Sequence, residues 1–239
     1  MHVRVMIYLI LSLLGCFSQI SAEINFTHRT DPYATHQPVL YEIASSTTGP
    51  IIEFGCGYGS TDILHEICRK SGRILISIED DEEWLNQFSP KYLGDGYELD
   101  NSGWHKFYFV PGKKDHTSCE HWLTFFKEHK ELFDDQYALT FVDQSPWQAR
   151  LETIKKFRSI SKYIILHDCD FFPEYHFAGK TVLHTDYENS IPGIYEFDDI
   201  ISHYKLYYPL KPWPLFSGPP TLLGSDFVSD FPEINYENY

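Results

Sequence analysis

The stretch PIIEFGCGYGSTDILHEICRKSGRILISIED, residues 50–80, decides the fold. It reads as a buried strand, a glycine-rich turn, an amphipathic helix and a second buried strand. Three glycines occupy every second position of the turn: Gly55, Gly57 and Gly59. Ser60 or Thr61 is a suitable helix cap, and the second strand ends in Glu79. The pattern therefore predicts a strand–helix–strand unit with a glycine turn that a ligand can approach.

The chemistry of this turn suits a nucleoside ligand. Glycines let the backbone turn tightly and let a ligand approach without meeting a Cβ. A carboxylate that closes the second strand can accept bonds from both ribose hydroxyls, each worth about 1.5–3 kcal/mol. Dinucleotide-binding enzymes share the layout but space their glycines as G-x-G-x-x-G, whereas here the order is E-x-G-x-G-x-G, with Glu53 in front. A turn that serves only strand–helix packing is the alternative.

The spacing with Glu53 in front resembles the first motif of class I S-adenosylmethionine-dependent methyltransferases. That resemblance implies S-adenosylmethionine as the cofactor, bound at the turn and at the neighbouring strand ends. The residues expected to bind it are Glu53, Gly55, Cys56, Gly57, Gly59, Glu79, Asp80 and Asp143.

The rest of the chain continues the alternation of helices and strands. Helices are expected over 31–46, 82–92, 117–133 and from about 147, with strands over 107–110, 137–142 and 163–166. A last helix over 196–204 precedes two strands, 205–210 and 221–223, which form a closing antiparallel hairpin. The fold class is therefore α/β, with a mostly parallel seven-stranded sheet in one domain over residues 23–239. This layout resembles the Rossmann-like sandwich of class I methyltransferases.

Composition narrows the kinds of partner. The chain has 239 residues, 43% of them apolar, and a formal net charge of −15. This charge argues against a nucleic-acid partner, since binding to a phosphate backbone depends on cationic side chains. It argues equally against an anionic membrane surface. Neutral or weakly acidic small molecules and glycans remain open as partners.

The N-terminus has the features of a secretory signal peptide. His2 and Arg4 precede an apolar run over 5–17, and Ala22 offers a cleavage site. The run is shorter than the roughly 20 residues of a membrane span, so no stable span is expected after cleavage; an uncleaved anchor is the alternative. Asn25-Phe26-Thr27 is an acceptor sequence for N-glycosylation. We therefore expect passage through the secretory pathway, to the lumen of the endoplasmic reticulum or Golgi or to the outside.

A second group of residues follows the fourth and fifth expected strands. Asp143 ends one strand, and His167, Asp168 and Asp170 end the next. Gathered carboxylates repel one another unless a cation or a shared proton relieves them. A divalent cation held by Asp143, Asp168 and Asp170 is the simplest relief, with His167 and Asp168 as the catalytic pair that takes a proton from a substrate hydroxyl. In the alternative, the acids cap helices and His167 anchors a loop.

Three strings resemble a narrower family. IEDDEEW (78–84), FVDQSP (141–146) and ILHDCD (165–170) are similar to motifs of the glucuronoxylan O-methyltransferase family of plant polysaccharide biosynthesis. The resemblance implies a Golgi enzyme that methylates a sugar hydroxyl with S-adenosylmethionine and a divalent metal. It covers about half of the chain. The segment 144–147 departs from the family pattern, and nothing from Phe171 onward matches, so the chemistry carries over better than the substrate. The aromatic segment 171–195 is expected to face the acceptor.

Two functions of different classes follow. The first is an S-adenosylmethionine-dependent O-methyltransferase of the secretory pathway, acting on a glycan or a small hydroxylated acceptor, with metal assistance. The second is a secreted binding protein on the same fold without catalysis, because S-adenosylmethionine is made in the cytosol and must be imported into the lumen. A nicotinamide-dependent oxidoreductase ranks third, given the glycine spacing.

Overall fold

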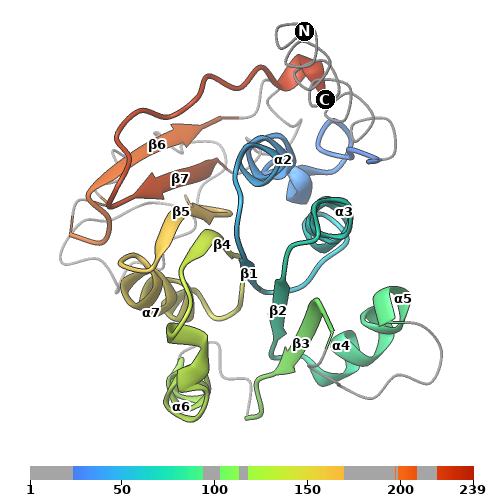
Figure 1. Cartoon of the computed structure of the whole chain (residues 1–239), viewed down its shortest axis with the longest axis vertical. Helices are drawn as coiled ribbons and strands as arrows, with labels where there is room; N and C mark the ends of the chain where they lie inside the picture. The colour runs from blue at the N-terminus through green and yellow to red at the C-terminus, as the bar shows by residue number, and fades with distance from the viewer. Residues whose placement is uncertain (1–23, 94–102, 113–117, 170–196, 198, 209–219) are drawn as a thin grey trace, which may run out of the picture.

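The computed structural model describes residues 24–93, 103–112, 118–169, 197, 199–208 and 220–239. These residues build one seven-stranded sheet in the order β3-β2-β1-β4-β5-β7-β6, with helices on both of its faces (Figure 1). The expected signal peptide, Asp170 and the segment 171–195 lie outside the described residues. Within the described part of the chain, every helix is too short or too polar to cross a membrane.

The sheet confirms the mixed architecture expected from the sequence. Five strands run parallel to one another: β1 (Ile51–Phe54), β2 (Leu75–Glu79), β3 (His105–Phe109), β4 (Tyr137–Val142) and β5 (Ser161–Leu166). The hairpin strands β6 (His203–Tyr207) and β7 (Thr221–Ser225) complete it. β7 runs antiparallel to both β5 and β6. Parallel strands that are buried on both faces need continuous apolar runs, which is why these segments are rich in Ile, Leu, Val and Phe.

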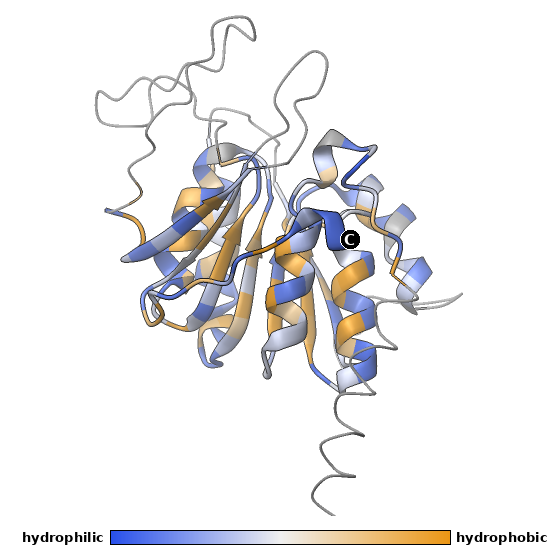
Figure 2. Cartoon of the chain, turned by 90° about the horizontal axis from the view of Figure 1, so that it is seen from above, coloured by the Kyte–Doolittle hydropathy of each residue, from blue (hydrophilic) through white to orange (hydrophobic). Residues whose placement is uncertain are grey.

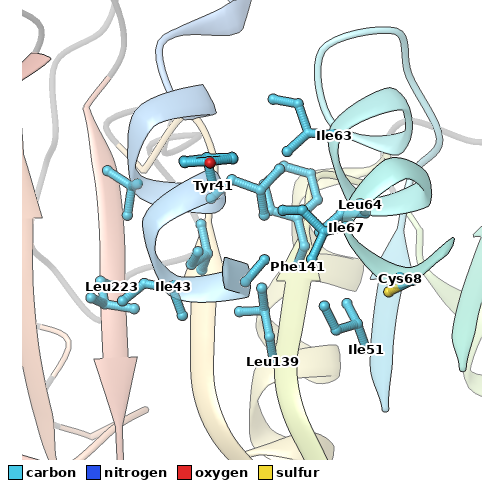
Figure 3. Packing of buried hydrophobic residues seen from close by; sticks show 14 of the residues in the cluster. Tyr41, Ile43, Ile51, Ile63, Leu64, Ile67, Cys68, Leu139, Phe141 and Leu223 are labelled. Carbon is cyan, nitrogen blue, oxygen red and sulfur yellow. The ribbon is translucent and has the colours of Figure 1, made fainter. Parts of the chain in front are cut away.

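Helices α2 (Gln37–Ser46) and α3 (Thr61–Ser71) cover one face of the sheet. Figure 3 shows Ile63, Leu64 and Ile67 of α3 directed at Phe141 and Leu139 of the sheet, with Tyr41 and Ile43 of α2 beside them. Burying each such aliphatic side chain contributes about 1.5–3 kcal/mol.

On the other face lie α6 (Glu120–Glu128) and α7 (Trp147–Phe157). Trp122, Phe126 and Phe157 pack there against Phe54 of β1. Figure 2 shows the result, with mostly apolar strands and helices that carry both apolar and polar surface.

Short helices connect these layers. The 3-10 helix η1 (Pro32–Ala34) precedes α2, so the helix expected over 31–46 is two helices. The helix expected over 82–92 also divides, into α4 (Glu82–Phe88) and α5 (Pro90–Leu93). Proline carries no N–H to continue the hydrogen-bond ladder of a helix, which explains the division at Pro90. The 3-10 helices η2 (Lys130–Phe133) and η3 (Tyr236–Asn238) complete the described elements.

The helix expected over 196–204 is wrong. The described residues of this segment form a turn, closed by bonds from the amides of Ile200 and Ile201 to the carbonyl oxygen of Phe197, 2.8 and 2.9 Å long. Strand β6 then begins at His203. Phe197, Ile200 and Ile201 have helical spacing in the sequence, but the structure buries them against α7 and the hairpin. Tertiary burial and strand pairing therefore outweigh the local pattern.

The topology locates the site. β1 lies between β2 and β4, so the strand order reverses beside β1. Ligands of open α/β sheets bind outside the carboxyl ends of the strands at this switch point. Glu79, Asp143 and His167 all stand at that edge.

Candidate active site

The glycine turn lies directly on the end of β4. Gly55 has φ +88°, and a Cβ there would come within 2.8 Å of the carbonyl carbon of Asp143. Gly57 differs, because the nearest atom that a Cβ would meet is the amide nitrogen of Gly59, 4.0 Å away. Gly55 is therefore required for the fold of the turn, whereas the Cα of Gly57 faces open space.

Glu53 lies beneath this turn. Its carboxylate is fully buried and accepts hydrogen bonds from Ser60 Oγ (2.5 Å), Thr61 Oγ1 (2.8 Å) and Ser77 Oγ (2.8 Å). Burial raises the pKa of Glu53 to about 7, against the opposing effect of these three bonds. In this structure Glu53 joins the start of α3 to β2 and so holds the turn in place.

Glu79 faces the turn from the end of β2. One oxygen accepts from the amide of Cys56, and the other accepts from the amides of Asp80 and Asp81, all at 2.9 Å. Burial raises the pKa of Glu79 to about 7, although the amide bonds favour the ionised form. Its neighbour Asp80 pairs with His121 of α6, whose Nε2 lies 3.0 Å from Asp80 Oδ2.

A cavity of about 250 Å³ opens between these elements. The side chain of Trp84 forms part of its wall, and the indole N–H donates to the carbonyl oxygen of Cys56 (3.0 Å). Five of the residues expected to bind the cofactor line this cavity: Gly55, Cys56, Glu79, Asp80 and Asp143. Glu53 lies below it, Gly57 is not part of its lining, and Gly59 lines a different cavity.

The acids of the fourth and fifth strands meet at the same edge. One ligand atom from each of Asp143, His167 and Asp168 lies within 4.8 Å of the others. His167 is 2% exposed, and its Nδ1 is 3.1 Å from Asp143 Oδ1. Its Nε2 is 3.2 Å from Asp168 Oδ1 but has no aligned hydrogen-bond partner. Asp168 has φ +50°, the one non-glycine residue with positive φ in the described chain.

Arg150 of α7 joins the two strand ends, and the sequence analysis missed it. Its guanidinium donates to the carbonyl oxygens of Gln144 (2.7 Å), His167 (2.8 Å) and Asp143 (3.0 Å). It also pairs with the Asp143 carboxylate at 2.9 Å. An arginine in the middle of a helix carries no sequence signal for this role, because several helical positions of the chain hold cations.

Charge in this cluster is largely balanced. Although burial works against it, the positive charges of His167 and Arg150 hold the pKa of Asp143 below its usual range. Burial also opposes protonation of His167, but the carboxylates of Asp143 and Asp168 raise its pKa. The cluster therefore holds two carboxylates beside one fixed cation, Arg150, and a histidine whose protonated form the carboxylates favour.

His36 is a second residue that the sequence analysis missed. Its ring lies 4.3 Å from that of His167 and 5.0 Å from that of Phe141, measured between centroids. It is 2% exposed, and neither ring nitrogen has a hydrogen-bond partner among the described residues. Burial lowers its pKa to about 3, so this ring is neutral. Nothing in the sequence around His36, two residues before Pro38, indicates that its ring packs against His167.

The donor set fits a divalent cation in part. Asp143 and Asp168 offer oxygens, and the unaligned Nε2 of His167 offers a nitrogen once its proton is lost. Arg150 already occupies one oxygen of Asp143, so this set suits a cation with mixed oxygen and nitrogen ligands. Asp170, expected as a third carboxylate, lies outside the described residues.

Comparisons with known proteins give a likeness of fold. The chain is similar in structure to a human methyltransferase 10 domain containing protein (14% identity, 83% of each chain, TM-score 0.46). It is similar to an O-methyltransferase from Bacillus cereus in complex with SAH (13% identity, 89% of this chain and 90% of the other, TM-score 0.46). It is also similar to the N-terminal domain of EvdMO1 with SAH bound (16% identity, 82% and 81%, TM-score 0.43).

No protein-family model and no curated protein matches the chain. Because the three TM-scores lie below 0.5, these likenesses carry no argument about activity.

Proposed function

We propose that the chain is an S-adenosylmethionine-dependent O-methyltransferase that acts on a sugar hydroxyl or another small hydroxylated acceptor. One observation carries the proposal: the cavity of about 250 Å³ lies against Asp143, which also belongs to the acid–histidine cluster. In this proposal the cavity binds the nucleoside and the cluster accepts the proton, and Asp143 belongs to both. The three strings that resemble the glucuronoxylan O-methyltransferase family favour a sugar hydroxyl.

The residues around the cavity have distinct roles in this proposal. Glu79 is placed to accept the ribose hydroxyls, exchanging its bonds to the Asp80 and Asp81 amides for bonds to the ligand. Gly55 keeps the turn low enough for the cofactor to lie above it. The cofactor supplies an electrophilic methyl group bound to a positively charged sulfur.

The acceptor is placed on the side of Asp168. Its hydroxyl oxygen would form a bond to the methyl carbon as the carbon–sulfur bond breaks, which would leave S-adenosylhomocysteine and a methyl ether. The hydroxyl proton goes to the Asp168 carboxylate, whose side chain is 26% exposed, with His167 Nε2 behind it. A positioned base of this kind contributes about 10²–10⁴-fold in rate.

Protonation of His167 sets the expected pH dependence. Asp143 and Asp168 raise its pKa, and only the neutral ring can take the proton on from Asp168. Turnover should therefore rise as the pH passes above the usual histidine range. A divalent cation on Asp143, Asp168 and His167 would add Lewis acidity toward the acceptor hydroxyl.

Transfer of a labelled methyl group to a panel of sugars and phenols tests the activity directly. We expect turnover in the wild type, loss of turnover in Asp168→Asn, and S-adenosylhomocysteine affinity retained by that variant in calorimetry. The assay is repeated in excess chelator and after adding back single metals. Full activity in chelator would remove the metal from the proposal and leave His167 and Asp168 as a metal-free pair.

The proposal places the enzyme in the secretory pathway, on the basis of the apolar run at 5–17 and Ala22. Expression in a eukaryotic secretory host, followed by mass spectrometry, should find an N-terminus at or near Glu23 and a glycan on Asn25. Full-length protein in the cytosol would contradict this location.

A binding protein without catalysis is the second candidate, and a specific observation favours it. Arg150 and the protonated form of His167 are enough to neutralise the clustered acids, so no metal or reaction is needed to explain them. Cofactor binding without turnover on any acceptor would support this candidate. Absence of cofactor binding would contradict both.

A further inference from the structure

A continuous chain of hydrogen bonds runs beneath the candidate cofactor turn and ends at a half-buried histidine. His65 Nδ1 of α3 lies 2.9 Å from His105 Nδ1 of β3. His105 Nε2 lies 3.1 Å from Ser77 Oγ, and Ser77 Oγ donates to Glu53 Oε2 at 2.8 Å. His105, Ser77 and Glu53 are buried, whereas His65 is half-buried and lines a cavity of about 570 Å³.

The hydrogen-bond chain continues from Glu53 into the glycine turn. Thr61 Oγ1 donates to the same Oε2 atom of Glu53 at 2.8 Å, so its lone pairs face the turn. The amide of Gly57 donates to Thr61 Oγ1 at 3.1 Å. Gly57 is thus two hydrogen bonds from Glu53 and five from His65.

While Glu53 is ionised, all hydrogen bonds of this hydrogen-bond chain must have the same donor-to-acceptor direction. A carboxylate only accepts, so Ser77 must donate to it and must accept from His105 Nε2–H. Neutral His105 then has an unprotonated Nδ1, and His65 must supply the proton between the two rings from its own Nδ1. Every bond from His65 to Glu53 therefore points inward.

We propose that His65, His105 and Ser77 are positioning residues of the cofactor turn that carry a proton between solvent and Glu53. The inference rests on the proposed function only in its last link, the effect on cofactor affinity. When one proton moves inward, His65, His105 and Ser77 each gain one proton and give up one. His65 gains a proton at Nε2 from water and passes its Nδ1 proton to His105 Nδ1. His105 passes its Nε2 proton to Ser77, and Ser77 passes its own to Glu53 Oε2.

Proton uptake changes the turn through one atom. Oε2 accepts from both Ser77 and Thr61. Once protonated, it must donate to Ser77, and its bond from Thr61 weakens. Thr61 holds the amide of Gly57, so the turn loosens where the cofactor is expected to lie. The ionised form of Glu53 should therefore bind cofactor more tightly than the neutral form.

Within the hydrogen-bond chain, Glu53 is the group whose protonation changes near neutral pH. Burial raises the pKa of Glu53 to about 7, whereas burial lowers that of His105 to about 3 and also lowers that of His65. The charged and titratable groups that face the chain are Asp143 and the thiols of Cys56 and Cys68 near Glu53, and Asp62, Glu66, Arg69 and Lys91 near His65. His65 and Tyr92 face His105, and the Tyr92 ring, 5.5 Å from that of His105 and 4.8 Å from that of His65 between centroids, also interacts with Glu53.

Nitrogen NMR of histidine-labelled protein tests the chain without any ligand. In the wild type, His105 should carry its proton on Nε2 at pH 8 and on Nδ1 at pH 5.5. Ser77→Ala cuts the chain and should abolish this exchange, while Ser77→Thr keeps the hydroxyl and should restore it. His65→Phe cuts the outer link at a half-buried position and should also abolish it, so the test does not depend on Ser77→Ala folding. His203→Phe, an exposed change on β6, is the matched control and should leave His105 unchanged.

Calorimetry with S-adenosylhomocysteine tests the link to binding. Wild-type affinity should fall about fivefold from pH 8.5 to pH 6, the equivalent of about one hydrogen bond. Ser77→Ala should bind more weakly at pH 8.5 and show a flatter pH profile, and Ser77→Thr should follow the wild type. An affinity independent of pH in the wild type would overturn the link to the turn. A His105 tautomer that is the same at both pH values would overturn the proton path.

If the wild type fails to bind S-adenosylhomocysteine at every pH, the proposed function fails. The NMR measurement then still decides the proton path by itself.

Discussion

Gly55 and Gly57 lie two residues apart in one turn, yet their surroundings differ. Gly55→Ala must place a Cβ 2.8 Å from the Asp143 carbonyl carbon at φ +88°. Strain of this kind costs about 1–3 kcal/mol before any clash is counted. Gly57→Leu meets no atom closer than 4.0 Å at its Cβ and should leave the fold intact.

Thermal unfolding and calorimetry with S-adenosylhomocysteine separate the two variants. We expect a lower melting temperature for Gly55→Ala, and an unchanged melting temperature with lost affinity for Gly57→Leu. Unchanged affinity in Gly57→Leu would remove the turn from the cofactor site.

Arg150 should be costly to replace. Its guanidinium bonds to three carbonyl oxygens and one carboxylate, so Arg150→Met leaves Asp143 partly buried without this partner. Removing one member of a buried ion pair lowers the free energy of unfolding by about 3–5 kcal/mol. The side chains of Arg150 and Asp143 are 12% and 27% exposed, so we expect a loss at the lower end of this range, about 3 kcal/mol. Arg150→Lys should recover little of it, because an ammonium group cannot reach the same fork of acceptors.

Urea unfolding measures these losses in free energy. Arg69→Met removes an exposed pair with Glu66 within α3 and is the matched control, with an expected loss below about 1 kcal/mol. Equal losses at both positions would contradict the role given to Arg150.

Single residues also show where the sequence stops being informative. The glycine pattern correctly predicted a turn at the switch point, because only glycine fits at Gly55. The sequence did not show that Glu53 would point beneath the turn, since a glutamate in a strand buried on both faces can point either way. His36 and Arg150 come from elements that carry no motif, and long-range packing alone brings them to the site.

At the scale of elements, strands with continuous apolar runs were predicted closely. β4 has the expected bounds, because its six apolar or small residues are flanked by Gln136 and Asp143. The hairpin was placed correctly, but its first strand begins at His203 and replaces the end of an expected helix. The pairing of β6 with β7 extends back to His203, opposite Ser225, and the spacing of apolar residues over 196–204 contains no information about this register.

The hairpin is held to the end of α7 by one ion pair. Asp226 accepts from Arg158 Nε (2.5 Å) and Nη2 (2.9 Å) and from the amide of Ser202 (2.8 Å). Asp226→Asn weakens bonds from a cation and should lower the free energy of unfolding by about 2 kcal/mol at pH 7. Arg158 and Ser202 lower the pKa of Asp226 in the folded state, although burial opposes them.

The lowered pKa fixes the sign of the pH dependence. The contribution of Asp226 is present above its unfolded pKa of about 3.9 and is lost as the pH falls through the lower folded value. Wild type and Asp226→Asn should therefore differ in urea unfolding at pH 7 and converge toward pH 3. Curves that stay parallel down to pH 3 would contradict this assignment.

For the whole molecule, the two ends of the described chain lie together. Phe26 packs edge-on against Tyr41 and Tyr239, with centroids 5.3 and 5.2 Å apart, and Arg29 donates to the carbonyl oxygen of Glu237 at 2.6 Å. Residues just beyond the proposed cleavage after Ala22 are thus part of the packed structure. A mature chain that begins at Glu23 would keep all of these contacts.

The four cysteines of that mature chain should all be free thiols. Cys56, Cys68, Cys119 and Cys169 form no disulfide, and Cys119 alone is not buried. Burial raises the pKa of Cys68 to about 12, that of Cys56 well above its usual value, and that of Cys119 to a smaller extent. Because thiolates are the reactive form, the folded protein should be slow to alkylate and to oxidise even in an oxidising compartment.

Iodoacetamide labelling followed by mass spectrometry tests this for the purified mature chain. At pH 8 without denaturant, we expect one slow modification, at Cys119. In denaturant without reductant, all four thiols should be labelled. A chain that stays unlabelled in denaturant until reductant is added would contain disulfides, and the packing of Cys56 beside the cofactor turn would then need another explanation. Fast labelling of Cys56 in the folded protein would instead mean that the turn opens, and bound S-adenosylhomocysteine should then slow it.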